Sequence, residues 1–242
     1  MLKSLKLDGI GPVQNLHAEF GERLNVLTGD NGLGKSFLLD VCFWTLTGTW
    51  PGARTALPDP DSKTNTPRIT FEVTGKTKSP LSKTASFDFH SQTWDRPPGR
   101  PTMPGLVVYA SVDGGFSVWD PARNYYRVPS SGRKGDFEQP RAYQFSSETL
   151  ASGLLDEQRT LCSGLIADWV RWFYGRSTHG SDSPFAHLET VVTALSHPDE
   201  PMSCATPVRV FTDDSREFPA LRTPYGVVPF PHWSAGVRRM IS

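Results

Sequence analysis

Alternating apolar and polar residues at the start of the chain predict two short strands. Leu2, Leu5 and Leu7 lie in the first, which Gly9, Gly11 and Pro12 end, and Asn15 to Phe20 form the second. Gly21 and Glu22 then turn the chain into an apolar run at 24–27, which predicts a third strand. From residue 37 to 46 the apolar residues recur with helical spacing, so a loop and then a helix follow this strand.

The middle of the chain changes character after Trp50. Residues 51 to 147 are rich in proline, glycine, serine and threonine, and short apolar runs predict a β-rich layer with strands at 68–73, 85–90, 106–111, 116–119 and 125–128. Asp113, Gly114 and Gly115 predict a hairpin turn between two of these strands. The segments 76–83 and 130–135 are expected to be mobile loops.

Helical spacing returns at Leu154. One apolar stripe from 154 to 173 predicts a single helix, with Ser152 as its cap and Gly175 as its end. A second helix is predicted over 185–195, with Ser183 as its N-cap and Pro184 at its first position. Strands at 208–211 and 225–229 precede a last helix that begins after Ser234.

Composition narrows the class of protein. The 242 residues are 37% apolar, enough for a real core, and 25 basic residues balance 25 acidic ones, so no global charge favours nucleic acid or a membrane. Cys42, Cys162 and Cys204 lack metal-ligand spacing and are interpreted as reduced thiols. No apolar run reaches the roughly 18 residues of a membrane span. A cytoplasmic protein is therefore expected.

The segment Gly29 to Ser36 carries the most informative chemistry. It matches G-x-x-x-x-G-K-[ST] between a predicted strand and a helix, which is the context this phosphate-binding motif requires. Its glycines let backbone N–H groups turn inward around a phosphate, Lys35 can reach the β- and γ-phosphates of ATP, and the Ser36 hydroxyl can ligate Mg²⁺. The expected nucleotide-binding residues are Gly29, Asp30, Asn31, Gly32, Leu33, Gly34, Lys35, Ser36 and Phe37.

The C-terminal segment offers a second candidate site. Ser234 precedes Gly236 and a predicted helix that carries Arg238 and Arg239. A serine at a helix N-terminus presents a hydroxyl and free N–H groups to an anion, although an ordinary capped helix has the same appearance.

Together the two segments resemble the ATP-binding-cassette ATPases, in particular their SMC, RecF and OLD-like branch, whose members are also called AAA family ATPases. The residues that carry the resemblance are TGDNGLGKS at 28–36 and the Ser-x-Gly pair at Ser234 and Gly236. The resemblance implies an α/β fold: a P-loop NTPase head with an antiparallel β layer and a helical insertion. It also implies that Ser234, Ala235, Gly236 and Arg238 contact the γ-phosphate of ATP held by a second subunit.

The sequence departs from this family in two ways. The long interval between Lys35 and Ser234 favours the RecF-like branch over compact transporter cassettes. No four-residue apolar run followed by Asp-Glu, the Walker B acid pair, occurs in a suitable place. We therefore expect one incomplete ATPase domain that lacks the C-terminal part of its core, either as the N-terminal part of a longer ATPase or as half of a split one. Its segments are 1–50, 51–150, 151–198 and 199–242.

The resemblance implies an ATP-dependent homodimer that sandwiches ATP and Mg²⁺ and acts on DNA, in repair or phage defence, often with a nuclease partner. ATP hydrolysis is expected only when the missing acid pair is supplied. Two alternatives stay open: a nucleotide-sensing clamp that binds ATP without turnover, and an ATPase subunit of a transporter.

Other groups of residues give weaker evidence of a functional site. The six histidines show no metal spacing, Arg54 is a further candidate for the phosphate region, and the aromatic residues at 169–173 are expected in a helix core.

Overall fold

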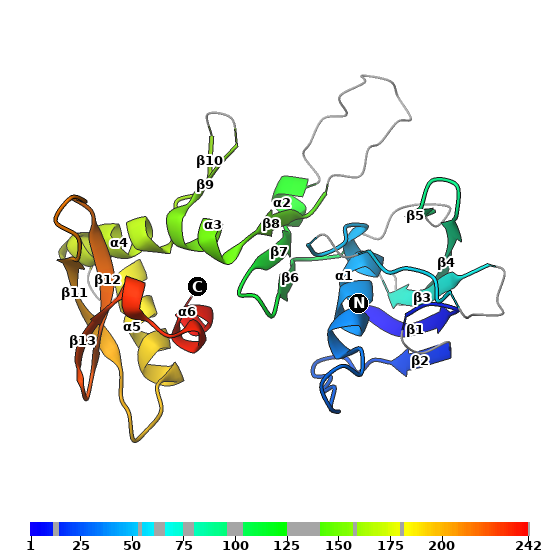
Figure 1. Ribbon diagram of the computed structural model, residues 1–242, viewed down its shortest axis with the longest axis horizontal. Coiled ribbons are helices and arrows are strands. Elements are labelled where there is room, and N and C mark those ends of the chain that lie inside the picture. Colours follow the sequence, from blue (N-terminus) through cyan, green and yellow to red (C-terminus); the bar gives the residue numbers. More distant parts are fainter. Residues whose placement is uncertain are drawn as a thin grey trace. The chain divides into compact units, whose positions relative to one another are not determined.

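The computed structural model describes the chain except for residues 12–14, 53–54, 61–65, 75–79, 96–103, 125–140, 157–158, 180–181 and 242. Two compact units are present. The first comprises Met1–Tyr109 and Ser117–Gln144, and the second comprises Ala110–Phe116 and Phe145–Ser242. Each unit is described separately below, with the elements labelled in Figure 1.

An antiparallel sheet in the order β2-β1-β3-β4-β5 forms the frame of the first unit. Its strands are β1 (Leu2–Asp8), β2 (Asn15–Glu19), β3 (Arg68–Thr74), β4 (Pro80–Asp88) and β5 (Thr93–Trp94). Leu5 lies opposite Ala18 on one side and Phe71 on the other. The first two predicted strands and the strand at 68–73 are confirmed. Part of the predicted loop 76–83 is wrong, because residues 80–83 belong to β4, while residues 75–79 lie outside the described part of the chain.

Helix α1 (Lys35–Thr47) packs on this sheet and confirms the predicted helix (Figure 1). Its buried residues Leu38, Val41 and Trp44 join the buried side chains of β1, β3 and β4 in one core. Three indoles close the end of this core: the ring of Trp44 is stacked on Trp50 at a centroid distance of 5.0 Å and tilted against Trp94 at 6.2 Å. The Trp94 indole N–H also donates a 2.8 Å hydrogen bond to the Ala56 carbonyl. Aromatic packing of this kind fixes the position of the helix.

The strand predicted at 24–27 is not formed. The segment has no ladder partner, and its side chains are exposed: Leu24 is 80% exposed, Val26 is 72% and Leu27 is 37%. A β-strand exists only where a neighbouring strand accepts and donates its backbone hydrogen bonds, and no other described strand lies beside this segment. The apolar run favours a strand, but its sequence cannot supply the neighbouring strand that pairing requires.

Three strands of the middle segment form a separate small sheet in the order β6-β7-β8: β6 (Val107–Ala110), β7 (Phe116–Trp119) and β8 (Tyr143–Phe145). The predicted strands at 106–111 and 116–119 are thus confirmed. So is the turn between them, where Ser111 N–H donates to the Gly115 carbonyl at 2.9 Å. A short helix, α2 (Pro121–Asn124), follows β7. The strand predicted at 125–128 and the loop at 130–135 lie outside the described residues.

The second unit is built on an antiparallel sheet in the order β11-β12-β13, with helices on it. Its strands are β11 (Ser203–Arg209), β12 (Glu217–Thr223) and β13 (Gly226–Pro229). Helices α4 (Leu165–His179) and α5 (Pro184–Leu195) pack against it through Trp169, which is fully buried, and Phe185. Helix α5 confirms its prediction in detail, because the Ser183 hydroxyl accepts a 3.1 Å hydrogen bond from Ala186 N–H.

The single helix predicted from 154 to 173 is wrong in its first half. Helix α3 (Ser147–Ser152) ends before it, the hairpin β9 (Leu154–Asp156) and β10 (Arg159–Cys162) follows, and α4 begins only at Leu165. Ser152 is the last residue of α3 rather than a cap, and Gly175 lies inside α4. Gly153 and Gly164 explain the break, because their φ angles of 98° and 85° are incompatible with an α-helix. The aromatic residues Trp169 and Phe173 are core residues, as predicted.

The base of the β9–β10 hairpin gives a test of this packing. A Cβ added at Gly164 would contact the Gly153 nitrogen and lie 2.6 Å from the Ser152 carbonyl carbon, against backbone that cannot move away easily. We expect Gly164→Ala to lower the free energy of unfolding by about 2–4 kcal/mol. Urea denaturation followed by tryptophan fluorescence measures this loss. Gly175→Ala is the matched control, because its Cβ would meet nothing within 4 Å, and it should be neutral or stabilising by up to ~1 kcal/mol. Equal effects of the two changes would contradict this account of the hairpin.

Two thiols are predicted to be inert. Burial raises the pKa of Cys42, on α1, and of Cys204, on β11, to about 12, because the thiolate loses hydration there. At pH 8 roughly one molecule in 10⁴ would carry either thiolate. Alkylation by iodoacetamide at this pH, measured by mass spectrometry, should be at least a hundredfold slower at both positions in the folded protein than in urea. Similar rates in both states would show that these side chains are accessible.

Candidate functional site

Residues 29–34 form a tight loop at the N-terminus of α1 in the first unit. Gly29, Gly32 and Gly34 have positive φ angles of 143°, 88° and 77°, which residues with side chains rarely adopt. A side chain at Gly29 would also lie 3.2 Å from Leu33. The glycines of the motif are therefore required by the backbone path that the loop takes.

The Lys35 side chain closes this loop. Its ammonium group donates hydrogen bonds to the carbonyl oxygens of Gly29 at 2.7 Å and Asp30 at 2.6 Å. The side chain therefore folds back over the loop that precedes it, with its charge held above the backbone. An ammonium in this place can exchange carbonyl oxygens for phosphate oxygens with little movement.

The first turn of α1 suits an anion. Its N-cap is Gly34, which supplies no side-chain hydrogen bond, and no acidic residue lies in the first turn. No carboxylate of that turn therefore competes with an anion for its N–H groups and for the positive end of the helix dipole. Ser36 is exposed beside them. The backbone N–H donors, the Lys35 ammonium and the Ser36 hydroxyl together fit a nucleoside triphosphate with its Mg²⁺.

Several hydrogen bonds that the sequence analysis missed hold α1 in place. The Tyr109 hydroxyl of β6 donates to the carboxylate of Asp40, which lies one helical turn after Ser36. At the other end of the helix, Ala142 N–H donates to the Thr49 hydroxyl at 2.9 Å, and the Gln144 amide donates to the Trp50 carbonyl at 2.7 Å. These partners are 69 to 94 residues apart in the chain, so no local pattern could reveal them.

The C-terminal candidates lie in the second unit. The Ser234 hydroxyl accepts a 3.2 Å hydrogen bond from Val237 N–H, so this serine caps helix α6 (Ala235–Ile241) and is itself exposed. The 3₁₀ helix η2 (Phe230–His232) leads into it, and Trp233 anchors the connection by donating to the Val228 carbonyl at 2.9 Å. Arg238 donates to the Pro231 carbonyl at 2.7 Å.

The structure thus groups the predicted residues into two sets. Residues 29–37 belong to the first unit, and Ser234, Ala235, Gly236 and Arg238 belong to the second. Arg54 lies outside the described residues. In the part of the chain that the structure describes, no group of three or more His, Cys, Asp or Glu side chains is placed to hold a metal ion. No described helix has both the length and the hydropathy of a membrane-spanning segment.

Comparison with known proteins finds one matching family model and two relatives that match short stretches. Residues 4–96 match the family described as the AAA domain. A stretch of 40 residues is 45% identical to the Septu protein PtuA of Bacillus thuringiensis and covers 16% of this chain and 10% of that protein. A stretch of 54 residues is 46% identical to the DNA repair protein RecN of Synechocystis sp. and covers 22% of this chain and 9% of RecN.

The matched stretches therefore span about a tenth of the length of each relative. Residues 4–96, which include the loop at 29–34, are therefore similar to the AAA domain.

Proposed function

We propose that this chain is the ATP-binding head of an SMC/RecF-like ATPase that acts on DNA, in repair or in defence against phage. The observation that supports this most strongly is the loop at 29–34, where three glycines with positive φ and the Lys35 ammonium surround the start of a helix. The name of one relative, DNA repair protein RecN, supports the link to DNA.

In this proposal each residue of the loop has one task. The backbone N–H groups of the loop and of the first turn of α1 would bind the β-phosphate oxygens, as such groups do where a glycine-rich loop precedes a helix. The Lys35 ammonium binds the β- and γ-phosphates, and the Ser36 hydroxyl is a ligand of Mg²⁺. The hydrogen bond from Tyr109 to Asp40 helps to hold α1, and with it the phosphate-binding groups at its N-terminus, in place.

We further propose that two copies sandwich ATP. The exposed Ser234 hydroxyl and the N–H groups that follow it would contact the γ-phosphate held by the loop of a second copy, with Ala235, Gly236 and Arg238 beside it. ATP binding would then close the dimer, because the nucleotide contributes contacts to both copies only in the closed state.

The exposed segment 24–27 supports a further part of this proposal. Apolar residues that lead directly into a phosphate loop need a neighbouring strand for their backbone hydrogen bonds and their side chains. We propose that a partner polypeptide supplies this strand together with the acid pair for hydrolysis. A nuclease is the partner that the resemblance implies.

Nucleotide binding is tested first at Lys35. Lys35→Ala should weaken binding of Mg²⁺-ATP at least tenfold, about 1.4 kcal/mol or more, because the ammonium that faces the phosphates is lost. Isothermal titration calorimetry on the full chain measures the change. Lys6→Ala, which removes an exposed lysine of β1 paired with Asp8, is the matched control and should leave the affinity unchanged. Unchanged ATP affinity in Lys35→Ala would refute the assignment of the loop.

The sandwich is tested at Ser234. Ser234→Arg should leave Mg²⁺-ATP binding intact but abolish ATP-dependent dimerisation, because a long charged side chain would occupy the space of the γ-phosphate. Light scattering coupled to size-exclusion chromatography, with a non-hydrolysable ATP analogue, measures the dimer. Ser203→Arg, at an exposed start of β11, is the control. If Ser234→Arg dimerises like the wild type, the role given to this serine is wrong.

Turnover separates this proposal from the alternative of a clamp that binds ATP without hydrolysis. The same chain should bind ATP but hydrolyse it only when the proposed additional strand and acid pair are supplied by a longer gene product or a partner. Steady-state phosphate release, measured for both forms, distinguishes the two. Release by residues 1–242 alone at the rate of the longer form would contradict the proposed completion.

A further inference from the structure

One face of α1 begins with the proposed Mg²⁺ ligand Ser36 and continues into contact with the β6-β7-β8 sheet. Its residues recur at the three- and four-residue intervals that keep side chains on one side of a helix: Ser36, Asp40, Phe43 and Thr47. We call this the Ser36 face. Leu38, Val41 and Trp44, which pack on the five-stranded sheet, lie on a different face of the same helix. The helix is therefore held on two faces.

The β6-β7-β8 sheet holds the Ser36 face near the middle of the helix. The Tyr109 hydroxyl of β6 donates to the Asp40 carboxylate, and the Tyr109 ring is tilted against Phe43 at a centroid distance of 5.7 Å. Phe43 is only 3% exposed, and it shares a small core with Trp119 of β7 and with Ala142, which precedes β8. A hydrogen bond and a buried aromatic cluster thus act on the same helix face.

A chain of hydrogen bonds continues this contact at the end of the helix. The buried Thr47 hydroxyl donates to the Phe43 carbonyl at 2.8 Å and accepts from Thr49 N–H at 3.2 Å. The Thr49 hydroxyl in turn accepts from Ala142 N–H at 2.9 Å. The Ser36 face is therefore held from Asp40 to the last turn, and the helix cannot rotate about its axis without breaking these contacts.

The residues that hold the Ser36 face lie outside the part of the chain that matches the AAA domain. The match covers residues 4–96, which include the loop and α1, whereas Tyr109, Trp119 and Ala142 follow it within the same first unit. Since the segment 24–27 has no strand partner among the described residues, the place of the loop depends on how α1 is held. These three residues therefore add support to the loop that the matched region alone does not contain.

We propose that Tyr109 is a positioning residue for the nucleotide site: through Asp40 it fixes the rotation of α1 about its axis and thereby the place of the Ser36 hydroxyl. This role rests on the proposed function, in which that hydroxyl is a ligand of Mg²⁺. A serine hydroxyl lies only one bond beyond Cβ, so its place follows the rotation of the helix, whereas the flexible stem of Lys35 lets its ammonium adjust. Loss of the Tyr109 hydroxyl should therefore act on the Mg²⁺-dependent part of ATP binding.

Calorimetry with ATP on the full chain, once with Mg²⁺ and once with EDTA, tests the role of Tyr109. Tyr109→Phe removes only the hydroxyl and keeps the ring against Phe43. It should weaken ATP binding at least about fivefold with Mg²⁺ and less than about twofold in EDTA, because one hydrogen bond that acts on the Mg²⁺ ligand is lost. Tyr225→Phe is the matched control: it removes a hydroxyl that donates to the Glu200 carboxylate at 3.1 Å in the second unit, and it should change neither affinity.

The partner residue and the Mg²⁺ ligand provide a second test. Asp40→Asn keeps an oxygen that can accept from Tyr109 and should bind Mg²⁺-ATP within about twofold of the wild type, whereas Asp40→Ala should match Tyr109→Phe. In the Ser36→Ala background Tyr109→Phe should cause no further loss, because both changes act on the same ligand. Additive losses, equal losses with and without Mg²⁺, or unchanged affinity in Tyr109→Phe would each overturn the proposal. Circular dichroism verifies that all variants fold.

Hydrogen exchange in the nucleotide-free protein separates this role from ATP binding itself. In the first turn of α1, Leu38 N–H donates to the Gly34 carbonyl at 2.9 Å. Tyr109→Phe should speed exchange over residues 35–40 at least about fivefold and leave exchange over α5 unchanged. Unchanged exchange over 35–40 would refute the role of Tyr109 even if ATP binds. If the wild type binds no Mg²⁺-ATP, the proposed function fails, and exchange alone then decides whether Tyr109 fixes the helix.

Discussion

The burial of one face of α1 against the sheet is the interaction on which the candidate nucleotide site depends. Leu38, Val41 and Trp44 are buried together with Leu5 and Phe71 of the sheet, so the helix cannot rotate without exposing them. The phosphate loop is the direct continuation of this helix. The packed helix therefore fixes the end of the loop from which its backbone donors and the Lys35 side chain extend, although the loop itself is exposed.

Backbone hydrogen bonding explains why the segment after this loop forms a helix while the segment before it forms no strand. The helix after it satisfies its own N–H and C=O groups and needs only a surface to pack on. The segment before it, 24–27, can satisfy its backbone groups only with a neighbouring strand, and its apolar side chains remain exposed without one. The loop is thus supported on one side by a complete element, while the segment on its other side has no strand partner among the described residues.

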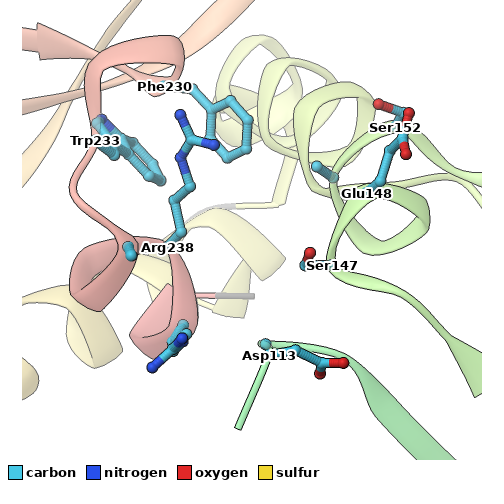
Figure 2. A pocket seen from close by; sticks show the side chains of 11 residues that line it. Asp113, Ser147, Glu148, Ser152, Phe230, Trp233 and Arg238 are labelled. Carbon is cyan, nitrogen blue, oxygen red and sulfur yellow. The ribbon is translucent and has the colours of Figure 1, made fainter. Parts of the chain in front are cut away.

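Aromatic packing has the equivalent role in the second unit. Trp169 of α4 is fully buried and meets Phe185 at 6.2 Å and Trp233 at 5.6 Å, both edge to face. Because Trp233 immediately precedes Ser234, this cluster sets the point at which α6 begins. Phe230 belongs to the same cluster, and Arg238 is held beside its ring (Figure 2), so the start of α6 and the position of Arg238 both depend on this packing. A change in the packing of Trp233 would therefore affect both.

The sequence by itself determined the elements whose signals are local. The motif at 29–36, the helix after it, the cap and proline that start α5, and the Asp-Gly-Gly turn were all predicted, because each depends on residues within one or two turns. It also determined that Trp169 and Phe173 are buried. The tertiary structure alone decided the rest. It turned 154–162 into a hairpin through two glycines with positive φ, left 24–27 without a ladder, and joined Asp40 to Tyr109. These outcomes depend on contacts between residues far apart in the chain, and periodicity carries no information about which distant segments meet.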